Sequence, residues 1–221
     1  MMNNLIVPIF KEGKMVGTAF ILEKENKHYL VSAAHTFCIS KKVGEPSILV
    51  QDESFSLLFK DVSYKIDLTK SIVEFDYKHA LPSGKFWDII IIPITEISID
   101  ANEELILAEE IDFTAPLELM GYDIDAEQQQ TKQLTNVEFG NVRVGINVSE
   151  TQSANNFVDN CFTAQSDLKE GFSGSPVLIE NSNKVVGLLI RDNSYKNSYD
   201  TSNKSFTFIN SNSIQQVFNN F

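Results

Sequence analysis

The sequence predicts an all-β protein built from antiparallel strands, and three observations favour this fold class. Short apolar runs recur along the chain, separated by turns rich in Gly, Pro, Asn, Ser and charged residues. The close spacing of these runs favours small antiparallel barrels over alternating strand–helix units. Apolar residues at helical spacing occur near the end of the chain, so one short C-terminal helix is expected after residue 210.

Composition limits the function classes. The 221 residues carry a net charge of −12, with 43% hydrophobic and 22% charged residues, which is typical of a globular protein. The acidic balance argues against binding to nucleic acid or to an anionic membrane surface, because phosphate contacts need clustered Lys and Arg. No apolar run is long enough for a membrane span.

The N-terminal residues and the cysteines suggest a location. Residues 1–10 lack a basic region and a small-residue cleavage site, so no signal peptide is expected. Only two cysteines occur, Cys38 and Cys161, and buried free thiols in a reducing cytosol are the favoured interpretation. We therefore expect a cytoplasmic protein.

The first half of the chain is expected to form strands joined by tight turns. Gly13 lies in a hairpin turn, and Gly44, Pro46, Pro82 and Gly84 mark loops. The segment 73–81 has no clear pattern. The expected strands are residues 5–10, 15–23, 28–32, 47–51, 54–59, 64–68 and 89–92.

An acidic segment, 98–110, is expected to connect the two halves of the chain. The second half again shows strand patterns, and the long stretch 134–148 is expected to contain two strands because Gly140 and Gly145 interrupt it. Ser211 or Ser213 is expected to cap a helix that runs through Phe221. The expected strands are residues 116–122, two within 134–148, and 157–164, 177–179, 184–191 and 205–209.

The most informative stretch is Gly171-Phe172-Ser173-Gly174-Ser175-Pro176-Val177. Ser173 is flanked by glycines and precedes an apolar run, so it is expected in a tight turn that enters a buried strand. Glycine permits positive φ and a close approach of a substrate carbonyl. The backbone N–H groups of Gly171 and Ser173 could then converge on one point, as an oxyanion hole requires.

Two further motifs precede this stretch. Val31-Ser32-Ala33-Ala34-His35 joins an apolar strand to a histidine, and Phe86-Trp87-Asp88 places an acid directly before four isoleucines. Together with G-F-S-G-S-P-V, these motifs resemble the histidine, aspartate and serine motifs of the trypsin-like (chymotrypsin-fold) serine peptidases, in that family's order. The spacings are 88 − 35 = 53 and 173 − 88 = 85 residues. The resemblance extends from about Leu5 to Phe221 and is greatest for small intracellular bacterial members.

The resemblance implies two antiparallel six-stranded β-barrels in one peptidase domain. Residues 1–110 would form the barrel with His35 and Asp88, and residues 111–221 would form the barrel with Ser173 and the terminal helix. The family's chemistry makes Ser173 the nucleophile, His35 the general base and Asp88 the residue that orients the imidazole. It implies a protein or peptide substrate, no cofactor and no metal.

Specificity is expected to depend on two segments. Asp167 lies six residues before Ser173, where an acid favours Arg or Lys in trypsin-like members; the alternative is a solvated loop aspartate. Ile190-Arg191-Asp192 replaces the Ser-Trp-Gly of digestive enzymes at the rim of the specificity pocket. The strand 184–191 that carries these residues is the expected docking edge for substrate.

Phe172 implies a different activation route from that of digestive members, which have an Asp before the nucleophile that pairs with a newly formed N-terminus. Activity would be constitutive, or controlled by a protein partner or by loop ordering, which is compatible with a regulated effector protease of narrow specificity. A catalytically silent peptide-binding module on the same fold remains an alternative. An esterase of the G-x-S-x-G type is excluded, because its histidine comes last and a helix follows its serine.

Overall fold

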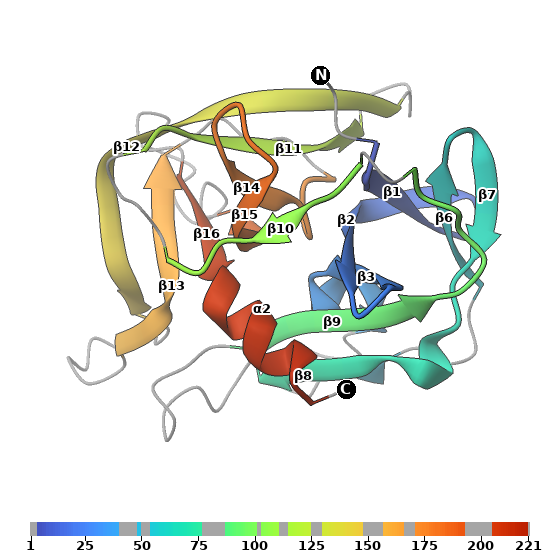
Figure 1. The fold of residues 1–221 in the computed structure, drawn as a ribbon. Coiled ribbons are helices and arrows are strands. Elements are labelled where there is room, and N and C mark those ends of the chain that lie inside the picture. Colours follow the sequence, from blue (N-terminus) through green and yellow to red (C-terminus); the bar gives the residue numbers. More distant parts are fainter. Residues whose placement is uncertain are drawn as a thin grey trace.

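The structure is a computed structural model that describes residues 4–39, 48–49, 54–76, 87–100, 103–110, 115–124, 130–147, 157–165, 171–192 and 205–220. It confirms the predicted fold class, because two antiparallel sheets lie side by side and one short helix ends the chain (Figure 1). The expected division into 1–110 and 111–221 stays a prediction. The first sheet takes its strands from residues before 95, and the second takes them from residues after 105.

The first sheet has seven strands in the order β7-β6-β1-β2-β3-β9-β8, where six were expected. Its two end strands, β7 and β8, follow one another in the chain and are joined by a segment that contains the short 3₁₀ helix η2 (Leu68–Lys70). Strand β8 falls within the segment 73–81 and just before it, where no clear pattern was found. The strands are β1 (Ile6–Lys11), β2 (Lys14–Lys24), β3 (Lys27–Ser32), β6 (Phe55–Phe59), β7 (Val62–Lys65), β8 (Ile72–Asp76) and β9 (Trp87–Ile94). A separate short pair joins β4 (Cys38–Ile39) to β5 (Ile48–Leu49).

The second sheet arranges six strands in a ring of antiparallel pairs, β15-β14-β11-β12-β13-β16, in which β16 returns to β15. A seventh strand, β10, pairs parallel with β15. The bounds are β10 (Ile106–Leu107), β11 (Leu117–Ile124), β12 (Gln130–Asn147), β13 (Phe157–Gln165), β14 (Pro176–Ile179), β15 (Lys184–Asp192) and β16 (Ser205–Asn210).

Several strand predictions were wrong in detail. The stretch 134–148 was expected to contain two strands, but residues 134–147 belong to one strand, β12. Near the two glycines, the pairing of β12 with β13 shifts in register, and no turn interrupts the strand. The acidic connection contains β10, which was not predicted. The expected strand 64–68 ends at Lys65, and its last residue belongs to η2.

The terminal helix α2 (Ser211–Phe218) is shorter than expected and is capped differently. The side chain of Asn210 accepts a hydrogen bond from the backbone N–H of Ser213 at 2.9 Å, so Asn210 is the cap. Ser211 instead donates its hydroxyl to the carbonyl of Ala108 at 2.7 Å. Phe221 lies outside the described residues.

Helix α2 ties the end of the chain to the first sheet. Phe218 packs edge-on against Tyr29 of β3, with ring centroids 5.2 Å apart. The Lys24 ammonium lies over the Phe218 ring and donates to its carbonyl at 2.7 Å, where a cation also complements the helix dipole. Figure 1 shows α2 beside β8 and β9.

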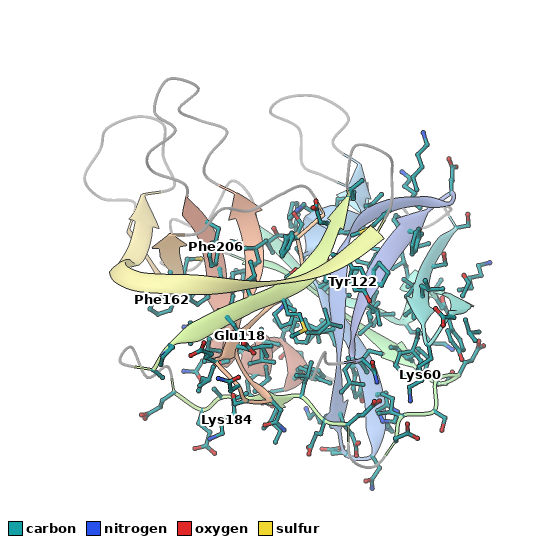
Figure 2. The ribbon with its side chains drawn as sticks, turned by 90° about the horizontal axis from the view of Figure 1, so that it is seen from above. Lys60, Glu118, Tyr122, Phe162, Lys184 and Phe206 are labelled. Carbon is teal, nitrogen blue, oxygen red and sulfur yellow. The ribbon has the colours of Figure 1, made fainter. Side chains whose placement is uncertain are left out.

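Two apolar clusters form the core. The larger one fills the first sheet and continues through the junction of the sheets to α2. The smaller one fills the second sheet and includes Phe162, Phe206 and the buried Phe172, which directly precedes the candidate nucleophile. Figure 2 shows Phe162 and Phe206 in the second sheet, and Tyr122 where that sheet meets the first. None of the described helices has the length and apolar character needed to cross a bilayer.

Candidate active site

His35 and Asp88 are brought together by the pairing of β3 with β9. Ser32, the last residue of β3, lies opposite Ile90, so the end of β3 adjoins the start of β9, where Asp88 lies. The chain then enters the 3₁₀ helix η1 (Ala34–Phe37), which carries His35. Ala33 and Ala34 are completely buried, and their small side chains let this turn pack against the core.

The carboxylate of Asp88 holds both the backbone and the ring of His35. Its Oδ1 accepts the His35 backbone N–H at 2.9 Å, and its Oδ2 lies 2.6 Å from the ring Nδ1. The Asp88 side chain is 3% exposed and that of His35 is 35% exposed. A proton on Nδ1 is then shared with Asp88, which leaves Nε2 as the basic nitrogen of the neutral ring.

This pairing sets the electrostatics of the imidazole. Burial lowers the pKa of His35, but the charge of Asp88 and the hydrogen bond to it raise the pKa, and the net result is a pKa above the usual value. The folded state therefore favours the protonated ring. The associated stability is fully present below about pH 6.5 and is lost as the pH rises through the folded pKa.

The Ser173 loop is a tight turn, as predicted. Gly171 and Gly174 have φ of +100° and +88°, which other residues adopt at a cost. The N–H of Ser175 donates to the carbonyl of Phe172 at 2.9 Å and closes the turn. The N–H of Gly174 donates to the carbonyl of Leu189 on β15, also at 2.9 Å.

Thr18, on β2, joins this loop to the histidine segment. Its N–H donates to the carbonyl of Ser173 at 2.8 Å, and its hydroxyl donates to the carbonyl of Gly171 at 2.8 Å. The same hydroxyl oxygen accepts the N–H of Tyr122 at 3.0 Å. The Thr18 carbonyl accepts the hydroxyl of Ser32 at 2.8 Å. One buried residue thus connects the loop, both sheets and β3, the strand that precedes His35.

Gly174 in the loop and Gly17, which precedes Thr18 on β2, allow the loop and β2 to lie this close together. A Cβ on Gly174 would lie 2.1 Å from the Thr18 carbonyl oxygen and 2.2 Å from the Ser32 hydroxyl. A Cβ on Gly17 would lie 2.8 Å from the Thr36 methyl and 3.0 Å from the Ser173 carbonyl oxygen. The backbone of Ser173 therefore lies close to the residue that follows His35.

The two N–H groups expected to form an oxyanion hole are not paired with any other described residue. Within the described part of the chain, no hydrogen bond uses the backbone N–H of Gly171 or of Ser173. Gly171 lies directly against β11, since a Cβ there would be 2.6 Å from the carbonyl oxygen of Tyr122. The oxyanion role of these groups stays a prediction.

The expected specificity residues are only partly described. Ile190 is buried on β15 and packs in the larger apolar cluster. Arg191 and Asp192 end the same strand, whose backbone is described there. Asp167 lies outside the described residues.

The cysteines are free, as expected, but only Cys161 is buried, and Cys38 is partly exposed beside the candidate site. Burial, together with the charge of Asp88, raises the pKa of Cys38 to about 11, so its thiol stays protonated at neutral pH and is a poor nucleophile. In the described ranges, no cluster of His, Cys, Asp and Glu has the arrangement of a metal site.

Thr18 is the site residue that sequence reasoning missed. Sequence analysis placed Thr18 only within the expected strand 15–23, and no role followed for the threonine. The available signal was a polar residue within an otherwise apolar strand, which must find hydrogen-bond partners once it is buried.

We predict different costs for alanine at two glycines with similar φ. Gly13 (φ +79°) has open space around a Cβ, so Gly13→Ala should cost about 1 kcal/mol of unfolding free energy. Gly174→Ala adds a collision with backbone and should cost more than about 3 kcal/mol. Equilibrium urea unfolding measures both, and equal costs would contradict the packing described here.

We predict that NMR titration of His35 gives a pKa above about 6.5. Asp88→Asn should lower this pKa, because the raising charge is lost while burial remains. Asp67→Asn removes an exposed carboxylate at η2 and serves as the control, which should leave the His35 pKa in place. An unchanged His35 pKa in Asp88→Asn would refute the assigned cause.

Comparison with solved structures identifies the fold. The inactive form of the Rv3671c protease of M. tuberculosis matches with a TM-score of 0.62 and 14% identity, over 99% of this chain and 89% of that chain. Kallikrein-related peptidase 10 matches with a TM-score of 0.59 and 11% identity, over 99% and 95% of the two chains. Neuropsin, a serine protease of mouse brain, matches with a TM-score of 0.60 and 10% identity, over 99% of this chain and 94% of that chain. No protein-family model and no curated protein matches the sequence. The chain therefore has the chymotrypsin fold of these serine proteases.

Proposed function

We propose that the chain is a serine endopeptidase that cleaves peptide bonds through His35, Asp88 and Ser173. The observation that carries this proposal is the hydrogen-bonded pair of a buried Asp88 and a partly exposed His35. A carboxylate held at 2.6 Å from Nδ1 keeps the other ring nitrogen free to accept a proton. The fold neighbours are serine proteases, which makes a peptide or protein the expected substrate.

In the acylation step, Ser173 Oγ attacks the substrate carbonyl carbon while its proton passes to Nε2 of His35. The carbonyl oxygen becomes an oxyanion and accepts hydrogen bonds from the N–H groups of Gly171 and Ser173. His35 then gives its proton to the leaving amine, the C–N bond breaks, and an acyl-enzyme ester remains on Ser173.

In the deacylation step, His35 removes a proton from water, which attacks the ester carbonyl. The same N–H groups stabilise the second oxyanion, and the imidazolium returns the proton to Ser173 Oγ as the acid product leaves. Asp88 stabilises the imidazolium in both steps and remains ionised. The balanced reaction uses these side chains and one water.

The raised pKa of His35 sets the pH dependence of this reaction. Only the neutral imidazole can act as a base, so kcat/KM should rise as the pH increases through that pKa. Asp88 both raises the pKa and orients the ring, which are two reasons for its burial beside His35.

Substrate would dock along β15, beside the loop, with Arg191 and Asp192 at the rim of the specificity pocket and Asp167 at its floor. An aspartate in that position favours a basic residue before the scissile bond. Phe172 leaves no carboxylate for pairing with a new N-terminus, so we propose constitutive activity or control by a protein partner, as in a regulated effector protease of narrow specificity.

We predict that a fluorophosphonate probe labels the wild-type protein and that Ser173→Ala abolishes the labelling. Peptide turnover should fall by a factor on the order of 10⁴ or more, because the triad acts as a unit. Ser211→Ala, which removes a buried hydroxyl outside the site, is the matched control and should be labelled like wild type. Absence of labelling in folded wild type would favour the alternative, a silent or latent peptide-binding module.

A further inference from the structure

We propose that the Thr18 hydroxyl positions the oxyanion-binding loop: by donating to the Gly171 carbonyl, it fixes the backbone that presents the N–H group of Gly171. This inference deepens the proposed function and depends on it. Thr18 is a positioning residue, because it acts on the loop backbone and does not touch the reacting atoms.

The direction of the Thr18 hydroxyl proton is determined by its neighbours. Thr18 is completely buried, so water does not compete for its hydroxyl. The N–H of Tyr122 can only donate, and it occupies an acceptor site of the hydroxyl oxygen at 3.0 Å. The single hydroxyl proton is therefore available to the Gly171 carbonyl at 2.8 Å. Figure 2 places Tyr122 at this junction of the sheets.

Gly171 is the residue of the loop that most needs such a contact. Gly171 has a φ of +100° and no Cβ, so rotation about its backbone bonds is less restricted than in any other type of residue. Rotation about Gly171 would turn its N–H away from a substrate oxyanion. The hydrogen bond from Thr18 fixes the Gly171 carbonyl and thereby restricts this rotation.

The next two residues are held by independent contacts. The Phe172 side chain is 2% exposed and packs in the smaller apolar cluster. The Ser173 carbonyl accepts the backbone N–H of Thr18, a bond that survives any change of the Thr18 side chain. Removal of the Thr18 hydroxyl therefore removes the hydrogen bonds to Gly171 and Tyr122 while leaving the anchors of Phe172 and Ser173 in place.

Thr18→Val keeps the shape of the side chain and removes its hydroxyl. A displaced oxyanion loop weakens only the transition state, so kcat should fall about 10²-fold while KM changes less than about threefold. Thr18→Ser keeps the hydroxyl, so its kcat should lie within about threefold of the wild-type value. The acid limb of the kcat/KM profile should stay in place, because the His35–Asp88 pair is untouched.

Ser211→Ala is the matched control, since it also deletes a buried hydroxyl that donates to a backbone carbonyl, at a position outside the proposed site. It should lower the melting temperature without changing kcat. If Thr18→Val does not fold, Thr18→Cys provides a weak S–H donor and should give a smaller loss of kcat. Unchanged kcat in folded Thr18→Val and Thr18→Cys, or equal losses in Ser211→Ala, would overturn the proposal.

A measurement without turnover separates this inference from the proposed function. The amide resonances of Gly171 and Phe172 should shift or broaden in Thr18→Val, but not in Ser211→Ala. If wild type shows no Ser173-dependent turnover, the proposed function fails, and the resonances still decide whether Thr18 fixes the loop. Unchanged resonances in Thr18→Val would refute the positioning role.

Discussion

The structure depends on one buried junction, where Thr18 of the first sheet meets the Ser173 loop of the second. Its N–H, hydroxyl and carbonyl make hydrogen bonds to Ser173, Gly171, Tyr122 and Ser32, and these partners belong to three segments: the Ser173 loop, β11 and β3. A buried polar group without partners is costly, so these bonds favour one relative position of the segments. The histidine and serine motifs are far apart in sequence, and this junction brings their backbones together.

A second constraint acts at the first sheet alone. Asp88 is buried directly before four isoleucines of β9, where an unpaired carboxylate would be costly. Its two hydrogen bonds to His35 offset that cost and fix the position of the ring. Strand β9, which contributes four isoleucines to the larger apolar cluster, therefore also positions the proposed base. The charge of the buried acid raises the pKa of the imidazole.

The sequence predicted the strands that carry strong apolar patterns and the segments that carry His35, Asp88 and Ser173, because local composition determines both. It failed where tertiary pairing decides. Strand β10 contains only Ile106 and Leu107 and exists because it pairs with β15. The helix cap is Asn210 because Ser211 is used by the distant carbonyl of Ala108. The role of Thr18 was hidden for the same reason, since its partners at Gly171 and Tyr122 are more than a hundred residues away.

The most direct test of this account is a crystal structure of the wild-type protein after reaction with a fluorophosphonate. We expect the phosphorus on Ser173 Oγ, with its oxygen accepting hydrogen bonds from the N–H groups of Gly171 and Ser173 at about 2.7–3.1 Å. His35 Nε2 should lie within hydrogen-bond distance of the adduct, with Asp88 still on Nδ1. An adduct whose oxygen points into solvent, with Gly171 rotated away from Thr18, would contradict the claim that this junction assembles the site.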